Sequence, residues 1–182
     1  MTRQPSNQWV LKSIDSQMTA HGWPLQSLCG LPPAHARSTV VTPYFHCWSV
    51  APRSFGSFAV EGAIGVIHQE FEREWMHDAQ HEPRAPGFAA ILHASNFSDL
   101  REKLYVPTTS DVGAEVEQLC TAVADILGSL PGNEAQLVAA FRKNELAGFP
   151  VDSFAGYAYR QKFAAFKRFV SHLRSDTAPP AA

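Results

Sequence analysis

The chain has 182 residues, of which 45% are hydrophobic, and a formal net charge of −2. This length fits one domain of ordinary size, and the hydrophobic fraction is enough for a well-buried core. The small net charge excludes a strong overall attraction to nucleic acid or to anionic lipid. We therefore expect one domain over residues 1–182, with residues 1–6 and 176–182 as disordered tails.

The cysteines and the N-terminal sequence bear on the cellular compartment. Cys29, Cys47 and Cys120 are far apart and form no Cys-x-x-Cys pair, so neither a disulfide framework nor a structural zinc site is indicated. The first eight residues are polar and lack the hydrophobic core of a signal peptide. No apolar run approaches the ~18 residues that a membrane span needs. We expect a soluble, cytoplasmic, bacterial-type protein without a membrane span.

The N-terminal segment predicts a helix over residues 7–21, with Ser6 as its N-cap. Apolar residues recur there every four positions, at Val10, Ile14 and Met18. Residues 25–37 are expected to form a loop, because this segment is rich in proline and contains Gly30.

Three segments predict strands that pair as an antiparallel sheet: residues 39–50, 57–67 and 88–93. The segment over residues 69–80 has two interpretations. Ile67, Phe71 and Trp75 recur every four positions, which is typical of a helix. Polar residues also alternate with apolar ones from His68 onward, which is typical of a strand. We favour a strand up to about residue 73, with irregular or helical structure after it.

The C-terminal third predicts three helices: one over residues 111–129, one over 133–147, and one that starts at Asp152 or Ser153. Ser110 or Asp111 is expected to cap the first, and Asn133 the second. The expected architecture is α+β: an N-terminal helix, a three-stranded antiparallel sheet, and three C-terminal helices packed on one face of that sheet.

A histidine and acid cluster is the strongest candidate for chemistry. If residues 70–81 are helical, Glu70, Glu74, His77 and His81 share one face, and Glu74-x-x-His77 has the spacing that di-metal carboxylate bundles use. A metal-dependent hydrolase or oxygenase is therefore an alternative function, with His68 or His93 in support. Such bundles need ligands from several helices, and no second Glu-x-x-His segment lies on another helix. We favour a solvated acidic segment and expect no cofactor.

Other catalytic motifs are missing from the sequence. His46 and Cys47 are neighbours on a predicted strand, so their side chains point to opposite faces and cannot pair with each other. We expect Cys47 to be a small core residue. No G-x-S-x-G, phosphate-loop or dinucleotide-binding motif is present. These absences favour a protein that is not an enzyme, and we predict no catalytic residues.

Charge is segregated along the chain. Residues 61–82 carry six acids and one base, and residues 153–174 carry five bases and no acid. The leading hypothesis is a non-enzymatic protein-binding module that presents a charged surface, as an immunity or accessory protein does. Its predicted contact residues are Glu72, Glu74, Asp78 and Glu82. The partner is a second protein or a second copy of the chain.

The basic C-terminal helix offers two further interpretations. It can pair with the acidic segment, within the molecule or across an interface. It can also bind nucleic acid through Lys162, Lys167, Arg168 and Arg174. The overall charge makes nucleic-acid binding the weaker alternative. No motif of a known family supports either interpretation.

Overall fold

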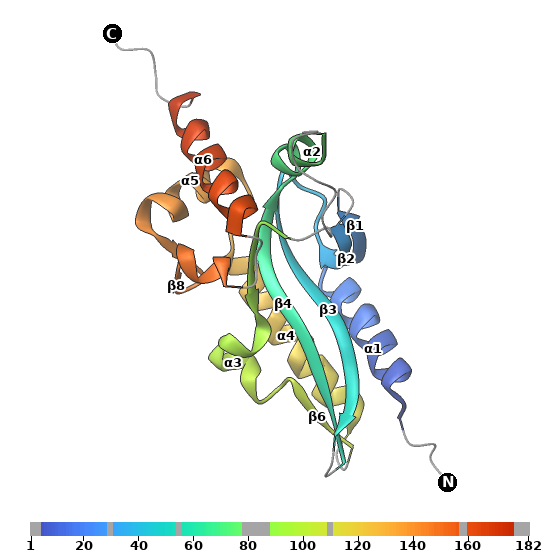
Figure 1. The fold of residues 1–182 in the computed structure, drawn as a ribbon. Coiled ribbons are helices and arrows are strands. Elements are labelled where there is room, and N and C mark those ends of the chain that lie inside the picture. Colours follow the sequence, from blue (N-terminus) through green and yellow to red (C-terminus); the bar gives the residue numbers. More distant parts are fainter. Residues whose placement is uncertain are drawn as a thin grey trace.

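The computed structural model describes residues 5–28, 31–53, 56–77, 88–108, 111–156 and 160–176, and its fold is shown in Figure 1. This part of the chain is α+β, with six α-helices, a six-stranded antiparallel sheet and a separate two-stranded sheet. The predicted architecture, with three strands and three C-terminal helices, is therefore wrong. Residues 1–4 and 177–182 of the predicted tails lie outside the described residues.

The large sheet has the strand order β1-β2-β3-β4-β5, and β6 pairs with β4 beyond the end of β5. Its strands are β1 (Leu25–Leu28), β2 (Leu31–Ala36), β3 (Val41–Arg53), β4 (Ser57–His68), β5 (Ala90–His93) and β6 (Tyr105–Pro107). Strands β3 and β4 form a long hairpin, whose register runs from Val41 opposite His68 to Arg53 opposite Ser57. This hairpin is the central feature of Figure 1.

Strands β1 and β2 occupy the segment for which the sequence predicts a loop. Proline has no N–H to donate to a strand ladder, so Pro32 and Pro33 argue against a strand. In the structure neither proline belongs to the residue pairs that join β2 to its neighbours; β2 pairs with β3 only at His35 and Ala36. Because the two prolines take no part in these pairs, they remove no hydrogen bond from the ladder, and the segment can form strands. The loop prediction is therefore wrong.

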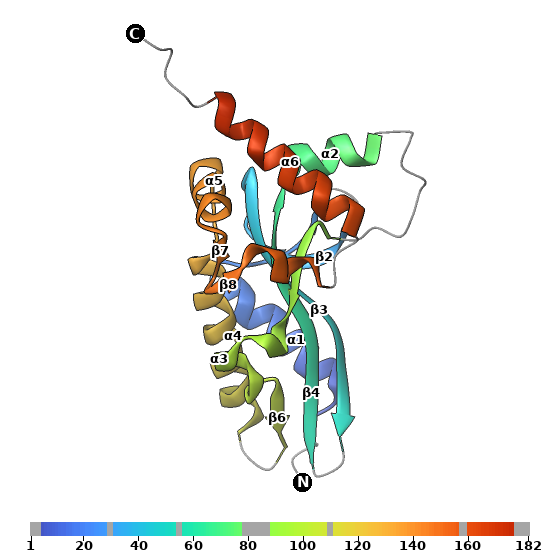
Figure 2. The same cartoon turned by 60° about the vertical axis from the view of Figure 1, so that its left-hand side comes forward.

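The α-helices of the described residues are labelled in Figure 1. They are α1 (Asn7–Ala20), α2 (Gln69–His77), α3 (Ser98–Arg101), α4 (Val112–Ser129), α5 (Glu134–Lys143) and α6 (Arg160–Asp176). Two 3-10 turns are η1 (Ala94–Asn96) and η2 (Val151–Ala155), and the small sheet is the hairpin β7 (Glu145–Leu146) and β8 (Phe149–Pro150). Helices α1 and α4 cover one face of the β3–β4 hairpin, while α2, α5 and α6 gather at its upper end (Figures 1 and 2).

Side-chain caps fix the starts of three helices. The Ser6 hydroxyl accepts a hydrogen bond from the Trp9 N–H at the start of α1. The Asp111 carboxylate accepts from two N–H groups of α4, and the Asn133 side chain accepts from the Gln136 N–H of α5. These contacts satisfy amide groups that the first turn of a helix leaves without partners. The predicted caps at Ser6, Asp111 and Asn133 are confirmed.

The main core lies between the sheet and the helices on its covered face. The periodic residues of α1, Val10, Ile14 and Met18, are buried there beside the apolar stripe of α4. Phe163 and Phe166 of α6 extend the same core to the upper end of the sheet. A second, smaller cluster on the other face includes Tyr44 and Phe88. Its rings stack with centroids 4.2 Å apart.

The segment after β4 is helical, so the favoured strand interpretation of residues 69–73 is wrong. Strand β4 ends at His68 and α2 begins at the next residue. The helical turn places Phe71 and Trp75 on one side, with ring centroids 5.9 Å apart, and Phe71 also contacts Phe166 of α6. Burial of these aromatic rings against α6 outweighs the alternation of polar residues.

Candidate functional site

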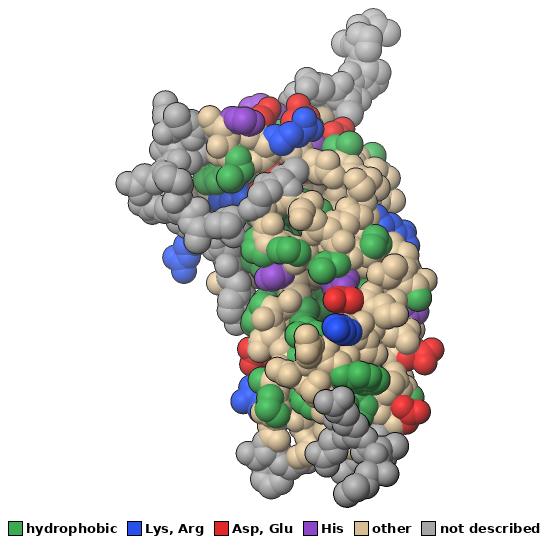
Figure 3. All heavy atoms as spheres, turned by 90° about the vertical axis from the view of Figure 1, so that its right-hand side faces the viewer, with side chains coloured by type: hydrophobic (Ala, Val, Ile, Leu, Met, Phe, Trp, Pro, Cys, Tyr) green, Lys and Arg blue, Asp and Glu red, His purple; other side chains and the backbone are tan. Residues whose placement is uncertain are grey.

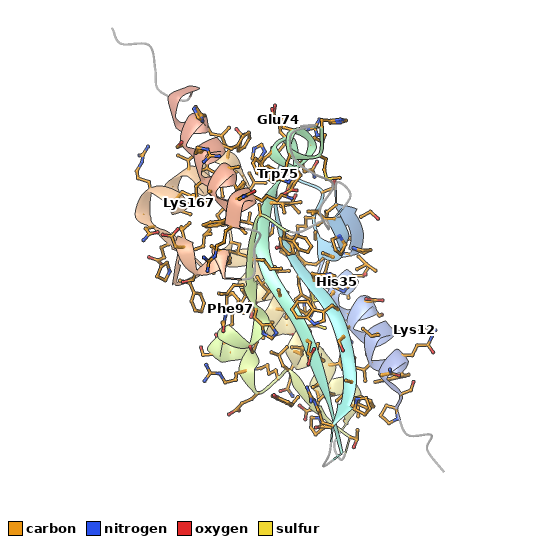
Figure 4. All side chains as sticks on the ribbon, in the orientation of Figure 1. Lys12, His35, Glu74, Trp75, Phe97 and Lys167 are labelled. Carbon is orange, nitrogen blue, oxygen red and sulfur yellow. The ribbon has the colours of Figure 1, made fainter. Side chains whose placement is uncertain are left out.

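The acids predicted to form a partner-binding surface do not share one environment. Glu74 is exposed on α2, and Figure 4 shows it at the upper end of the molecule, pointing away from the sheet. Glu72 is fully buried, so it lies on no free surface. Asp78 and Glu82 lie outside the described residues. The structure therefore supports an exposed position for only one of the four predicted contact residues.

The predicted metal ligands are brought together only in part. Glu70, Glu74 and His77 all lie on α2 with exposed side chains, and His81 lies outside the described residues. Within the described ranges, no group of three His, Cys, Asp or Glu side chains is placed to hold a metal ion. The second helix that a di-metal site needs is not supplied by the neighbours of α2 that the structure describes.

Glu72 forms a buried ion pair with Lys162 of α6. The Lys162 ammonium donates to the Glu72 carboxylate at 2.5 Å, and the two side chains are 3% and 0% exposed. The second carboxylate oxygen, Oε1, has no hydrogen-bond partner within the described part of the chain. Burial raises the pKa of Glu72, and the ammonium beside it opposes that shift. The pair joins α2 to α6 and realises, inside the molecule, the predicted match between the acidic segment and the basic helix.

His68 and Tyr44 complete a group of buried titratable side chains near this pair. The His68 ring is fully buried; its Nε2 lies 3.0 Å from the Glu134 carboxylate, and its Nδ1 has no hydrogen-bond partner among the described residues. The Tyr44 hydroxyl donates to the Ala90 carbonyl at 3.0 Å, and burial raises the Tyr44 pKa. Both rings are fully buried, so a substrate has no access to them in this conformation. The Tyr44 contact connects β3 to β5, and the His68 contact connects β4 to α5.

The described cysteines are poor nucleophiles. Burial raises the pKa of Cys47 to about 12 and the pKa of Cys120 to about 12. Because the thiolate is the reactive form, such thiols are inert near neutral pH.

Two histidines of the sheet are held by local hydrogen bonds. His46 is hydrogen-bonded through Nδ1 to the Pro33 carbonyl at 2.9 Å. His93 contacts the Ser95 hydroxyl through Nδ1 at 2.6 Å.

The basic helix is not a continuous cationic surface. Lys162 is buried, and Lys167 pairs with Asp152 at 2.7 Å. Arg168 is exposed, and the Arg174 side chain lies outside the description. Figure 4 places Lys167 on the side of α6 away from the sheet. Figure 3 shows another face, the right-hand side of Figure 1, and acidic and basic side chains are interspersed there. Two of the four predicted nucleic-acid contacts on α6 are therefore used within the molecule.

An open hollow in the described structure runs along α4. Its other wall is built by the α3 region and the β7–β8 hairpin, which lie along α4 in Figure 2. Its volume is about 820 Å³. We call it the α4 groove. Its lining residues are Phe97, Ser98, Asp99, Lys103, Ala114, Glu117, Gln118, Thr121, Ala122, Asp125, Ile126, Ser129, Ala147 and Phe149.

The α4 groove combines an apolar wall with acidic rims. Phe97, labelled in Figure 4, and Phe149 of β8 meet edge to face with ring centroids 5.0 Å apart. Ile126 is half-buried on the α4 side. Glu117 and Asp125 are exposed on α4, and within the described residues neither forms an ion pair. The arrangement suits an apolar ligand that carries positive charge.

Two features of the opposite wall shape the α4 groove. Lys103 lies at its edge, where its ammonium donates to the Asp99 backbone carbonyl at 2.9 Å. Ala147, at the tip of the β7–β8 hairpin, has φ +46°, a conformation that costs an L-residue about 1–2 kcal/mol. Its methyl group is packed against the core and lines the groove. The strained turn thus places an apolar group at the groove wall.

Sequence reasoning missed the α4 groove. The signal in the sequence is weak: Glu117, Thr121 and Asp125 are spaced by four on the polar face of α4, which is the ordinary pattern of a solvated helix face. The opposite wall comes from segments that precede and follow α4 in the chain, and their approach to α4 depends on the tertiary fold.

Comparison with protein-family models, with curated proteins and with solved structures finds no match. In the part of the chain that the structure describes, no helix has the length and hydrophobicity needed to cross a membrane. The functional proposal therefore depends on the geometry of the chain itself.

Proposed function

We propose that this chain is a non-enzymatic protein-binding module and that the α4 groove is its binding site. The observation that carries the proposal is an open groove of about 820 Å³ with an apolar wall and acidic rims that have no ion-pair partners among the described residues. The leading sequence hypothesis, binding of a partner through a charged surface, is kept. Its location is moved from α2 to α4.

The shape of the α4 groove favours a polypeptide over a small molecule. Small-molecule sites bury roughly 70–90% or more of the ligand surface. Here Glu117, Gln118, Thr121 and Asp125 are all exposed along one side, so a small ligand would stay largely in solvent. A polypeptide segment can cover the same length and make contacts along all of it.

The character of the groove side chains supports a binding role. Its three carboxylates, Asp99, Glu117 and Asp125, are exposed to solvent, and the lining that the structure describes includes no histidine and no cysteine. The Glu72–Lys162 pair and the His68 ring are buried and do not line the groove. Buried ion pairs of this kind also occur as structural elements.

Site-specific photo-crosslinking in living cells tests the proposal. A photoreactive residue replaces Gln118, which is exposed in the groove, and in a matched control it replaces Ser171, which is exposed on α6. We expect one protein to be crosslinked from Gln118 and not from Ser171. The purified partner should then bind the wild-type chain and bind a Gln118→Arg/Ile126→Glu variant at least ~30-fold more weakly, which corresponds to ~2 kcal/mol at a central contact.

Equal crosslinking from both positions, or unchanged affinity of the groove variant, would contradict the proposal. A Glu70→Lys/Glu74→Lys variant distinguishes the two surfaces. Loss of binding in this variant alone would return the binding site to the exposed face of α2, where the sequence analysis placed it.

A further inference from the structure

We infer that the occupant of the α4 groove is a cationic, amphipathic helix of a partner protein. This inference rests on the proposed function and names the chemistry of the partner. It follows from the length of the groove along α4 and from the placement of its charged and apolar side chains. It also follows from the composition of the other segments of this chain, which could otherwise fill the groove.

The length of the groove fits a helix of about four turns. Its lining residues on α4 extend from Ala114 to Ser129. Fifteen residues of α-helix rise about 22 Å at 1.5 Å each. A helix that lies along α4 buries one apolar stripe and needs no free backbone hydrogen-bonding groups in the groove, because its own backbone groups are paired internally. An extended strand would need a sheet edge along the groove, and the β7–β8 hairpin of the opposite wall has only two residues in each strand, which is far shorter than the α4 side.

The charges select a cationic partner. Glu117 and Asp125 are separated by eight residues, which is about 12 Å along the helix axis, and both lie on the outer rim. Asp99 adds a third acid at the opposite wall, against one base, Lys103. Basic side chains one or two turns apart on each flank of the partner helix can reach these carboxylates. Complementary charge of this kind steers encounter and rejects acidic partners.

The apolar contact is concentrated near the hairpin. Ile126, Ala147 and Phe149 line this end of the groove together with the Phe97 ring. An aliphatic or aromatic side chain on the partner helix fits among these groups as its anchor. Anchors of this type carry most of the affinity in helix-in-groove recognition.

The remainder of this chain does not supply such a helix. Of the segments outside the described residues, each carries at most one lysine or arginine: Arg3 in residues 1–4 and Arg84 in residues 78–87. Helix α6 is basic, but its apolar stripe is already buried in the core through Phe163, Phe166 and Val170. No segment within residues 1–182 therefore fills the groove, and we assign the groove to a partner protein.

Designed peptides test the inference directly, because they replace the partner with a helix of defined chemistry. The first is a helix-forming peptide of about 16 residues built from Ala, Leu and Lys, with leucines on one stripe and lysines on both flanks. The second has glutamate in place of every lysine, and the third has the first composition in an order that destroys the stripe. Each is labelled, and its affinity for the full chain is measured by fluorescence anisotropy at low ionic strength.

We expect the lysine peptide to bind and the other two to bind at least ~10-fold more weakly, as complementary charge and an ordered stripe require. The Glu117→Lys/Asp125→Lys variant should lose at least ~10-fold in affinity for the lysine peptide, whereas a matched Glu70→Lys/Glu74→Lys variant should stay within ~2-fold. Binding should weaken as salt is raised. Circular dichroism confirms that both variants, which change only exposed side chains, are folded.

Three results of the peptide and sedimentation experiments would overturn the inference, and a fourth comes from the crosslinking. The first is equal binding of the glutamate and lysine peptides, and the second is no binding of the lysine peptide. The third is self-association of the chain in sedimentation that the Glu117→Lys/Asp125→Lys change abolishes, which would assign the groove to a second copy. A crosslinked partner from Gln118 whose captured segment is not a basic helix would leave the proposed function intact and remove this inference alone.

Discussion

Removal of Lys162 alone should destabilise the fold strongly. The Glu72 carboxylate is fully buried, and Lys162 supplies the charge that faces it at 2.5 Å. In a Lys162→Met variant the carboxylate remains in a low-dielectric site, with its Oε1 already lacking a partner. Loss of one member of a buried pair costs about 3–5 kcal/mol. A domain of this size has a total stability of about 5–15 kcal/mol, so the change removes a large share of it.

Replacement of both members should have a different outcome. In a Glu72→Leu/Lys162→Met variant neither member of the pair is charged, and the apolar side chain at position 162 lies near the Trp75 ring, whose centroid is 6.0 Å from the Lys162 ammonium. Buried pairs that are replaced by apolar residues of similar volume are commonly neutral or more stable by about 1–4 kcal/mol. The wild type, the two single variants Lys162→Met and Glu72→Leu, and the double variant form a double-mutant cycle. Its coupling energy measures the interaction between the two side chains.

Urea unfolding followed by tryptophan fluorescence gives the free energy of unfolding of each variant. The control is the exposed pair Lys167–Asp152, whose loss in Lys167→Met should cost only about 0–1 kcal/mol. Destabilisation by Lys162→Met of less than about 1 kcal/mol, or a double variant as unstable as the sum of the singles, would refute the argument that desolvation dominates this pair.

Three further predictions concern separate parts of the molecule. Gly148→Ala should lower the free energy of unfolding by about 1–2 kcal/mol, because φ is +82° there. Gly128→Ala in α4 should raise it by about 0.5–1 kcal/mol, because an added Cβ meets no atom within 4 Å. Thermal melts compare the two variants. Burial lowers the pKa of His35 below its ordinary 6.5, so the unfolded chain gains the proton first and stability should fall as the pH decreases from 6.5 towards the folded pKa. That slope, measured by urea unfolding at several pH values, should be smaller in His35→Gln, and equal slopes would contradict the burial argument. Cys47 and Cys120 should react with iodoacetamide much more slowly in the native protein than in urea, because burial raises each pKa to about 12. Peptide mass spectrometry measures the extent of labelling, and rapid labelling of Cys47 in the native protein would exclude this explanation.

The elements that the sequence predicted well are those with a long amphipathic stripe and a side-chain cap. Helices α1 and α4 begin and end within one or two residues of the expected limits, because a buried face with a period of 3.6 leaves a local signal. The central hairpin was also predictable, since β3 is rich in β-branched and aromatic residues and Phe58, Val60, Ile64 and Val66 share one face of β4. Helix α5 ends at Lys143 and not at Ala147, because Asn144 adopts the left-handed conformation.

Elements that depend on distant partners were not predictable. Strands β1 and β2 are short, and β2 contains two prolines. These prolines lie outside the ladder only because of the positions at which β2 pairs with β1 and β3. Glu72 illustrates the same limit for a site residue. In the sequence it is one of three acids that alternate with other residues and look equally solvated, and only the presence of Lys162, 90 positions later, makes its burial possible.

The buried pair changes how the remaining charge should be interpreted. Segregated charge along a chain suggests a charged surface, but one of the acids and one of the bases are used internally to hold α2 against α6. Asp152 is paired with Lys167, and Glu134 lies against His68. Several exposed acids form no ion pair within the described residues, Glu70 and Glu74 of α2 among them. Glu117 and Asp125 also belong to this group, and they flank an apolar hollow on α4. Charge left unpaired beside apolar surface is a better indicator of a binding site than charge density in the sequence, because paired charges have already exchanged their solvation for a contact within the fold.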